Sequence, residues 1–328
     1  MDFEVTFIHD ILNIIPQIMV LISVCIPTFN NSHGIKTTVE KLILEAKNSN
    51  LLDNLEFCIS DNSDNTDSEE IVTAIKAIPG ARIYYLRHGQ NLGYDRNVDA
   101  AVRLASGKYC WLLSDNEDIR AGSFGEIIAS IKNQPDTGLF IICPQSITSN
   151  NLKTYSNLEK AIKENGWWIP GGLVSRNIIK RSLIPSDLSV YYGNDWLHLS
   201  ITTLVGGKSP VTFVSEKFIH DPNEKSRWAK NGKTFVTYTN LLSIIKHLPS
   251  PPYSKEFVSM MTKRMLRGLP QNILSAKIYG LRATFENWKR LYTATRGQKL
   301  YLFLSSLTMM VPPIFVIYGK KIKHTLGN

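Results

Sequence analysis

Short apolar runs alternate with helix-like segments over the first 220 residues of the chain. Each run is apolar on both faces, and most runs are followed by a segment with the spacing of an amphipathic helix. We expect strands at 20–26, 55–60, 82–86, 109–113 and 138–143, and helices near 35–47, 68–78, 95–105 and 123–132. This alternation predicts an α/β, Rossmann-like fold with a mostly parallel sheet and helices on both faces.

Beyond residue 224 the pattern changes to helical stripes. Apolar residues recur at four-residue spacing over 257–269, with lysines and arginines between them, and Gly268 and Pro270 stand at the end of this stripe. It predicts a basic amphipathic helix that ends there. A second stripe over 278–292 predicts another basic amphipathic helix.

An uncharged run over 300–318 follows these stripes, with basic residues on both sides. Its length is near the lower limit for a membrane-spanning helix, and Pro312 and Pro313 interrupt it. We expect helices of this region to lie in a membrane interface, held by apolar faces and by attraction to anionic lipid. There are two alternatives: the run spans the membrane as a helix, or the apolar stripes pack on the first 224 residues of the chain.

Charge is distributed unevenly along the chain. Residues 1–224 hold 19 Lys and Arg against 26 Asp and Glu, whereas residues 225–328 hold 18 Lys and Arg and only two acidic residues. A basic region of this size predicts a polyanionic partner. We expect an anionic membrane surface and no nucleic acid, because no nucleic-acid-binding motif is present and the aromatic residues follow a packing period.

Composition and cysteine spacing narrow the class of protein. Hydrophobic residues make up 43% of the 328 residues and charged residues 20%, which excludes a mainly disordered or multi-span membrane chain. The four cysteines form no CxxC pair, and we expect them to be buried thiols in a reducing compartment.

The residue pattern and the charge distribution divide the chain into an N-terminal extension (1–19), an α/β domain (20–224) and a basic helical region (225–328). The extension carries no Lys or Arg and is not typical of a secretory signal.

Polar residues follow each of the first four predicted strands. The first is followed by Thr28 and Asn30, the second by Asp61, the third by the NLGYDRN segment and the fourth by the acidic residues 115–118. Because ligands of parallel α/β sheets bind outside the carboxyl ends of the strands, these loops are the expected site. Ordinary turn chemistry explains any one loop alone. Closely spaced carboxylates suit a hard cation such as Mg²⁺ or Mn²⁺ that clamps phosphate oxygens.

The strings at these strand ends resemble a known family. ISVCIPTFN, ISDNSDNTD and NLGYDRNVDAAVRLASGKYCWLLSDNED, in this order, resemble the nucleotide-sugar-binding half of family 2 glycosyltransferases with the GT-A fold. The last string is most similar to the abequosyltransferase-like branch that builds bacterial O-antigens. The resemblance covers roughly residues 20–220.

The resemblance implies roles for the donor-binding residues. Thr28 and Asn30 are expected beside the nucleotide, Asp61 on the base, and Arg96 on the nucleotide or its phosphates, where a guanidinium fork is suited to the contact. Asp115 is also expected at the donor. Thr28 as a loop-capping hydroxyl and Arg96 as a plain surface residue are the alternatives.

The same resemblance implies a metal site. Asp115, Asn116 and Glu117 occupy the place of the family's DxD-type motif and are expected to hold Mg²⁺ or Mn²⁺. Asn116 stands where the related branch has a carboxylate, which leaves Asp115 and Glu117 as the two hard oxygen ligands. His220 is a candidate third contact, with an ordinary loop histidine as the alternative.

Residues 166–200 resemble the acceptor half of the family. Trp168, Gly171 and Gly172 lie in a segment typical of sugar-stacking loops, although a tryptophan pair also suits a core. Asp195 matches the family's general base, which takes a proton from the acceptor hydroxyl during inverting transfer. The alternative role for Asp195 is an N-cap for a helix that begins at Trp196.

The expected function is transfer of a sugar from a nucleoside diphosphate donor to a glycan hydroxyl. We expect an inverting enzyme of bacterial surface polysaccharide synthesis, peripheral on the cytoplasmic face of the inner membrane, with a polyprenyl-diphosphate-linked acceptor. One alternative is a non-catalytic relative of the same fold. Another is a nucleotidyl- or phosphosugar-transferring enzyme, although the glycine-rich GxGxxG and GxxxxGK[ST] phosphate loops are absent.

Overall fold

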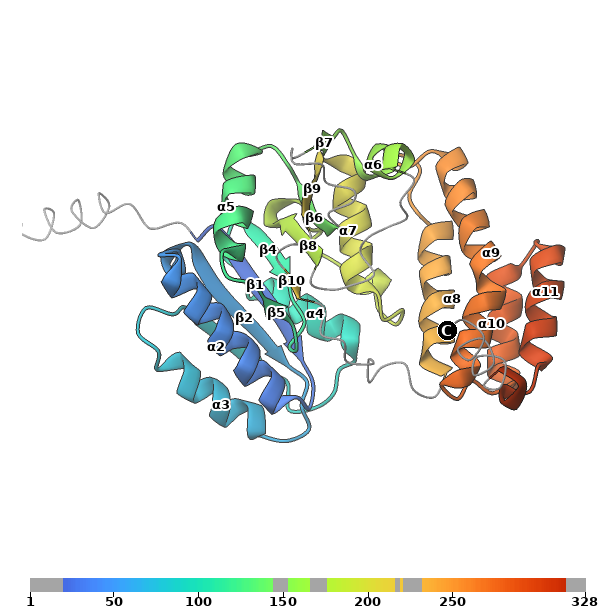
Figure 1. The fold of residues 1–328 in the computed structure, drawn as a ribbon, viewed down its shortest axis with the longest axis horizontal. Coiled ribbons are helices and arrows are strands. Elements are labelled where there is room, and N and C mark those ends of the chain that lie inside the picture. The colour runs from blue at the N-terminus through green and yellow to red at the C-terminus, as the bar shows by residue number, and fades with distance from the viewer. Residues whose placement is uncertain (1–19, 144–152, 166–175, 216–218, 221–231, 317–328) are drawn as a thin grey trace, which may run out of the picture.

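The computed structural model describes residues 20–143, 153–165, 176–215, 219–220 and 232–316. Predicted features at other positions, including the extension 1–19 and the boundary at 224, lie outside the described residues. Figure 1 shows an α/β body built around a sheet and a bundle of helices beside it.

The first half of the sheet is parallel, as the sequence pattern predicts. Strand β1 (Ile22–Thr28) lies between β2 (Leu55–Asp61) and β4 (Tyr109–Leu112), and it pairs in parallel with both. Strand β3 (Ile83–Arg87) pairs in parallel with β2 at the edge. The carboxyl ends of these four strands therefore meet at one edge of the sheet.

The second half makes the sheet mixed rather than mostly parallel. Strand β8 (Asn177–Lys180) runs antiparallel between β4 and β6 (Leu139–Cys143), and β9 (Val211–Ser215) pairs in parallel with β6. The two-residue strand β7 (Thr154–Tyr155) closes the order β3-β2-β1-β4-β8-β6-β9-β7. The sequence pattern missed β8 because its apolar run is only two residues long.

Helices cover both faces of the sheet. One face packs against helices α2 (Ser32–Asn48), α3 (Asp67–Lys76) and α5 (Ser123–Asn133). The other packs against α4 (Tyr94–Arg103), α6 (Leu158–Asn165) and α7 (Leu197–Lys208). Alternation along β1 explains the two cores, because Ile22, Val24 and Ile26 enter the first core and Cys25 the second.

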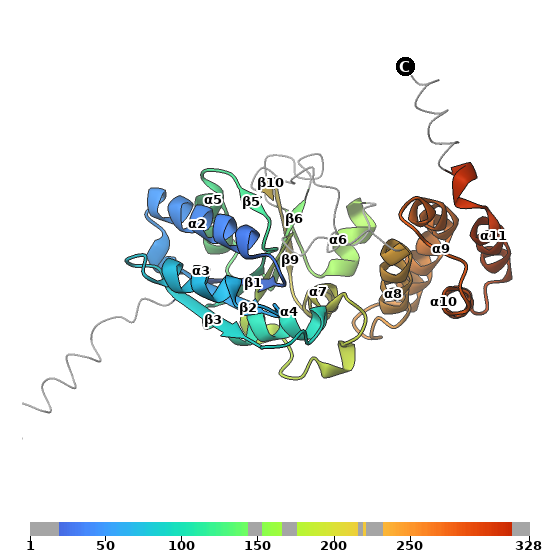
Figure 2. The same cartoon turned by 90° about the horizontal axis from the view of Figure 1, so that it is seen from below.

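Four further helices follow the sheet. They are α8 (Lys233–Lys246), α9 (Lys255–Ile278), α10 (Phe285–Thr295) and α11 (Lys299–Met310). Figure 2 shows that they stand beside the α/β body as a bundle. Short 3-10 turns at Leu52–Asn54, Arg181–Leu183 and Ser189–Tyr191 complete the described elements.

The prediction that a helix ends at Gly268 and Pro270 was wrong. Helix α9 continues through Pro270 to Ile278, and the break falls at Gly280, which has a φ of 91°. Leu269 and Ile273, on either side of the proline, are fully buried. Burial of this apolar face outweighs the loss of one helical hydrogen bond at the proline.

The bundle shares its core with the α/β body. Tyr253 donates a hydrogen bond to the carbonyl of Thr203 in α7 at 2.7 Å, and the indole of Trp196 donates to the carbonyl of Thr237 in α8 at 2.7 Å. Both contacts join residues on the two sides of the predicted boundary. The start of α8 is therefore held against the segment that leads into α7.

The structure also bears on the apolar run at 300–318. Helix α11 takes up its first part and ends at Met310, before Pro312. None of the helices in the described ranges has the length and hydropathy that a membrane span requires.

Candidate active site

A cavity of about 430 Å³ lies at the carboxyl ends of the parallel strands. Its walls come from the loops after β1, β2, β3 and β4, from the residues before α7 and from the start of α8. The lining residues are Pro27, Thr28, Phe29, Asn62, Asn91, Gly93, Tyr94, Asn97, Ser114, Asp115, Asp195 and Lys233. Three predicted site residues, Thr28, Asp115 and Asp195, are among them, so the expected convergence of the four loops is observed.

Asp115 and Thr28 form the floor between β1 and β4. The Thr28 hydroxyl donates to Asp115 Oδ2 at 2.6 Å, and the Thr38 hydroxyl of α2 donates to the Asp115 carbonyl at 3.1 Å. Burial raises the pKa of Asp115 above its ordinary value, and the hydrogen bond from Thr28 offsets part of this shift. The carboxylate is thus fixed at the cavity, and a nearby cation would stabilise its charged form.

Two asparagines that the sequence analysis did not single out also face the cavity. Asn62 donates to the carbonyl of Gly93 at 3.0 Å, and Asn97 donates to the carbonyl of Thr28 at 2.9 Å, so each ties two loops together. Both side chains are buried, and neither side-chain oxygen accepts a hydrogen bond from any described residue. These two oxygens are unpartnered among the described residues, although they are not exposed to solvent in this structure.

Asp61 does not line the cavity. Its side chain is fully buried at the end of β2, where Oδ1 accepts from the Ser63 amide at 2.8 Å and Oδ2 accepts from the Tyr85 hydroxyl at 2.7 Å. Burial, with help from this hydrogen bond, raises the pKa of Tyr85 well above its ordinary value. Asp61 therefore holds the β2 loop against β3 in this structure, and its predicted contact with a base stays a prediction.

Asn30 and Arg96 also lie away from the lining. Asn30 has a left-handed φ of 48° and exchanges two hydrogen bonds with Asp64, which joins the β1 and β2 loops. The exposed Arg96 guanidinium lies 5.5 Å from the centre of the Tyr192 ring. Because successive helix residues differ by about 100° in direction, Asn97 faces the cavity while Arg96 faces outward. Neither residue lines the cavity, and the predicted donor contacts of Asn30 and Arg96 stay predictions.

The acidic segment after β4 presents one carboxylate to the cavity. Asn116 is exposed, and its oxygen accepts from the Ser114 hydroxyl at 2.5 Å, while Glu117 lies outside the lining. Within the described part of the chain, no group of three His, Cys, Asp or Glu residues is arranged to hold a metal ion. Asn116 and Glu117 as metal ligands therefore stay predictions.

Backbone pairing brings the late histidine to the same segment. Strand β10 (Ile219–His220) pairs antiparallel with β5 (Asp118–Ile119), and His220 stands opposite Asp118 in this register. His220 is therefore not in an ordinary loop. Its backbone lies beside the acidic segment.

Asp195 reaches the cavity from the segment before α7. The predicted alternative, an N-cap for this helix, is wrong, since α7 begins at Leu197 with Trp196 at the N-cap position and without a side-chain cap. Asp195 has a φ of 59°, in the left-handed region that few non-glycine residues adopt. No hydrogen bond from the described residues occupies its carboxylate. The group is thus available as a proton acceptor.

Lys233, the first residue of α8, is a cation at the cavity that the sequence analysis did not identify. It belongs to the basic helical region and follows the residues of the β4 loop by more than a hundred positions. No local motif marks it. It lines the same cavity as Asp115 and Asp195 and gives that cavity a positive group that suits a phosphate ligand.

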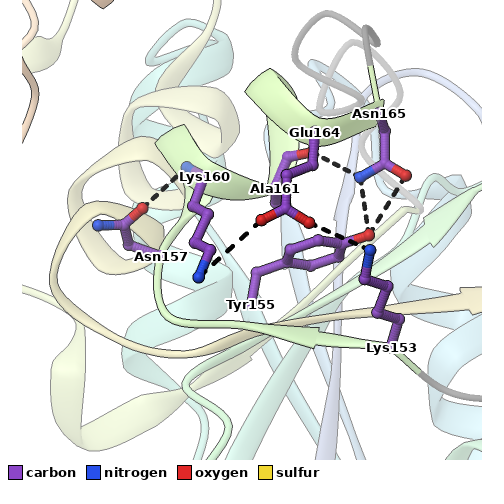
Figure 3. A network of polar contacts seen from close by, with 7 residues as sticks. All are labelled: Lys153, Tyr155, Asn157, Lys160, Ala161, Glu164 and Asn165. Atoms are coloured by element: carbon purple, nitrogen blue, oxygen red, sulfur yellow. Dashed lines mark hydrogen bonds and ion pairs between the residues drawn. The ribbon is translucent and has the colours of Figure 1, made fainter.

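The predicted acceptor residues Trp168, Gly171 and Gly172 lie outside the described residues. The helix that precedes them is firmly attached to β7, as Figure 3 shows. The Asn165 amide donates to the Tyr155 hydroxyl at 2.8 Å and to the Ala161 carbonyl at 2.6 Å, and Lys153 pairs with Glu164 at 3.1 Å. These contacts fix where the predicted acceptor segment begins.

Comparison with known proteins identifies this domain. The family model described as "Glycosyl transferase family 2" matches residues 23–185. This part of the chain belongs to glycosyl transferase family 2. The abequosyltransferase RfbV of Salmonella typhimurium is 32% identical to this chain over 138 residues. The match takes in 42% of this chain and spans only 39% of the length of that relative.

Solved structures share the fold of this chain at low identity. S. aureus TarS 1–349, in complex with UDP-GlcNAc, is 12% identical with a TM-score of 0.54, over 87% of this chain and 90% of that one. The mannosyltransferase PcManGT of Pyrobaculum calidifontis, in complex with GDP-Man and Mn²⁺, is 13% identical with a TM-score of 0.55, over 88% and 86%. The expected GT-A fold with a helical C-terminal region is confirmed, and its sheet is mixed.

Proposed function

We propose that the protein is a glycosyltransferase that uses a nucleoside diphosphate sugar. The observation that carries this proposal is the cavity at the strand ends, where Thr28, Asp115 and Asp195 meet. A volume of about 430 Å³ lies within the range of small-molecule sites. The family of the domain supports the same donor class, and so do the complexes of TarS with UDP-GlcNAc and of PcManGT with GDP-Man.

The nucleoside and the sugar have matching groups in the cavity. Asn62 and Asn97 line the cavity, and a small shift of their side chains would present their unpartnered oxygens to the hydroxyls of a ribose or the N–H groups of a base. A ligand that donates hydrogen bonds to such buried acceptors is favoured, because a buried acceptor without a partner costs about 1–3 kcal/mol. The β1 and β2 loops that Asn30 and Asp64 hold together would frame this subsite.

A divalent ion fits the site if the substrate shares its coordination. Mg²⁺ is commonly held by one or two carboxylates together with substrate phosphates, and the cavity supplies the carboxylate of Asp115. When bound, such an ion offsets the charge of the departing diphosphate. Lys233, which also lines the cavity, would contribute to the same task, in the role that the sequence analysis expected for Arg96.

Asp195 is the proposed general base. The acceptor hydroxyl attacks the anomeric carbon of the donor sugar, the bond from that carbon to the diphosphate breaks, and the hydroxyl proton passes to the Asp195 carboxylate. The nucleoside diphosphate leaves with the bonding electron pair, next to Asp115 and Lys233. Attack opposite the leaving group inverts the anomeric centre.

The proposed acceptor is a polyprenyl-diphosphate-linked glycan of bacterial surface polysaccharide synthesis. The likeness to an abequosyltransferase supports a glycan acceptor. Trp168, Gly171 and Gly172 are the proposed contacts with the acceptor sugar. A lipid-linked acceptor would place the enzyme at the cytoplasmic face of the inner membrane.

The outer face of α11 supports a membrane-bound location. Its exposed residues Leu300, Phe303, Leu304, Leu307 and Met310 form one apolar stripe, while Ser305 and Met309 pack inward. A helix of a globular protein ordinarily shows the opposite arrangement. The described residues 232–316 also hold twelve Lys and Arg against two Glu. An apolar stripe in a basic region suits anionic lipid.

The double substitution Phe303→Ser/Leu307→Ser is expected to weaken binding to lipid vesicles by about tenfold or more, since each substitution removes apolar surface that the bilayer would bury. Co-sedimentation with phosphatidylcholine vesicles, with and without phosphatidylglycerol, measures this effect. Leu44→Ser on α2, where Leu44 is 59% exposed, is the matched control. Equal binding of the double variant and the wild type would contradict membrane docking through α11.

Lys233→Met is expected to weaken nucleoside diphosphate binding by about tenfold to a hundredfold, the effect of losing one charge-assisted hydrogen bond. Binding of the uncharged nucleoside should be unchanged, because methionine keeps the aliphatic part of the side chain. Calorimetric titration compares the two ligands. Lys132→Met, at an exposed position of α5, serves as the control, and a Lys233→Met variant with wild-type diphosphate affinity would refute the proposed contact.

Mass spectrometry of lipid-linked glycans tests the function itself. A strain that lacks the protein is expected to accumulate a truncated intermediate, and purified protein with the correct donor should extend that intermediate by one sugar. An unaltered glycan profile, together with no extension by any nucleoside diphosphate sugar, would refute the proposed function.

A further inference from the structure

The segment before α7 adopts an unusual backbone. Gly193 and Asp195 both have positive φ, 87° and 59°, within three residues of each other. A single non-glycine residue in the left-handed region costs free energy, so its neighbours must hold it there. The strained residue is the one whose carboxylate lines the cavity.

The buried carboxylate of Asp95 holds this segment. Oδ2 accepts from the backbone amides of Gly193 at 2.8 Å, Asn194 at 3.0 Å and Asp195 at 3.0 Å, and Oδ1 accepts from the amide of Leu197 at 3.0 Å. Asp95 is only 3% exposed. The amides of residues 193, 194, 195 and 197, all in one turn, form a backbone nest around this carboxylate at the positive end of α7.

Asp95 lies directly behind the wall of the cavity by its place in the chain. It lies on α4 between Tyr94 and Asn97, whose side chains line the cavity. The carbonyl of Asn194 accepts in addition from Asn240 of α8 at 2.9 Å. The backbone on both sides of Asp195 is thus fixed while its carboxylate is left available.

We propose that Asp95 is a positioning residue that holds Asp195 in the orientation required for proton transfer. The inference rests on the proposed function, because it assumes that Asp195 acts as the base. Asp95 touches neither donor nor acceptor, and it acts only through the backbone of residues 193–197.

Asp95→Asn keeps the shape of the side chain but loses its charge and turns an amide NH₂ toward backbone donors. We expect kcat for sugar transfer to fall by about tenfold to a hundredfold, as misplacement of a catalytic group does, with an unchanged Kd for nucleoside diphosphate. The matched control is Asp99→Asn, one turn further along α4, where the carboxylate accepts from the Tyr192 hydroxyl and pairs with Arg103. The control should keep wild-type activity.

The double variant Asp95→Asn/Asp195→Asn separates positioning from a general structural role. If Asp95 acts through Asp195 alone, the double variant is as slow as Asp195→Asn and no slower. A further loss in the double variant, or wild-type activity of Asp95→Asn, would overturn the proposal. Wild-type activity of Asp195→Asn would instead refute the base assignment of the proposed function.

Gly193→Ala keeps the proposal testable if Asp95→Asn does not fold. Its added Cβ has open space around it but strains a backbone with a φ of 87°. We expect a smaller loss of kcat that again disappears in the Asp195→Asn background. An unchanged kcat in Gly193→Ala, or a loss that persists in the double variant, would count against control of Asp195 by this segment.

Discussion

Asp195→Asn is expected to lower kcat for sugar transfer by about 10²–10⁴-fold, the contribution of a positioned general base. Asparagine keeps the volume of the side chain but cannot take a proton from the acceptor hydroxyl. Because Asp195 makes no side-chain hydrogen bond to the described residues, the substitution should leave the free energy of unfolding nearly unchanged. Steady-state transfer assays, with thermal unfolding in parallel, measure both quantities.

Asp187→Asn is the matched control for Asp195. Asp187 is an exposed aspartate in the same connection before α7, and it caps the amide of Ser189 at 2.8 Å. The control should transfer sugar at the wild-type rate. An Asp195→Asn variant that retains more than a tenth of wild-type kcat would exclude Asp195 as the general base.

Asp115→Asn is expected to lower transfer by about 10²–10³-fold and to stabilise the protein at neutral pH. Burial raises the folded-state pKa of Asp115 above its unfolded value, so the native state binds more protons between these two values. The free energy of unfolding therefore falls as pH rises through that window, and the variant lacks this loss. Thermal midpoints at acidic and neutral pH, measured for both proteins, give the difference.

Stabilisation by a divalent ion is a second test of Asp115. Mn²⁺ with nucleoside diphosphate should raise the unfolding midpoint of the wild type and should do so much less in Asp115→Asn. Asp53→Asn, at an exposed aspartate before the start of β2, controls for loss of one negative charge. Equal stabilisation of Asp115→Asn and the wild type by Mn²⁺ would remove Asp115 from the proposed ion site.

The sequence predicted the front half of the fold well because local pattern and burial agree there. The strands at 55–60 and 109–113 correspond to β2 and β4, which are buried on both faces. Strand β8 could not be found, since NIIK contains only two apolar residues and is buried by neighbours far away in the chain. In α9, tertiary packing overrides the helix-ending signal of Pro270.

The loops that the sequence singled out line a common cavity, but only some of the residues predicted for the site face it. The rule that ligands bind at strand ends located Thr28 and Asp115. Side-chain direction then decided between neighbours, since Asp61 points toward Tyr85 while Asn62 lines the cavity. Neighbouring residues at a strand end or on a helix point in different directions, and a sequence pattern does not say which of the two faces the cavity.

Long-range contributions to the site were not predictable from the sequence. Lys233 reaches the cavity because α8 is packed against the segment before α7, a contact that no spacing encodes. Asp95 was assigned only to the start of a helix. Its role depends on amides a hundred positions later.

Titration of the wild-type protein with UDP, CDP and GDP in the presence of Mn²⁺ tests the central claim most directly. If the cavity binds a nucleoside diphosphate, at least one of the three raises the midpoint of thermal unfolding, and a hundredfold excess over Kd adds about 2.7 kcal/mol to the free energy of unfolding. No shift with any of the three nucleotides at millimolar concentration would contradict the account.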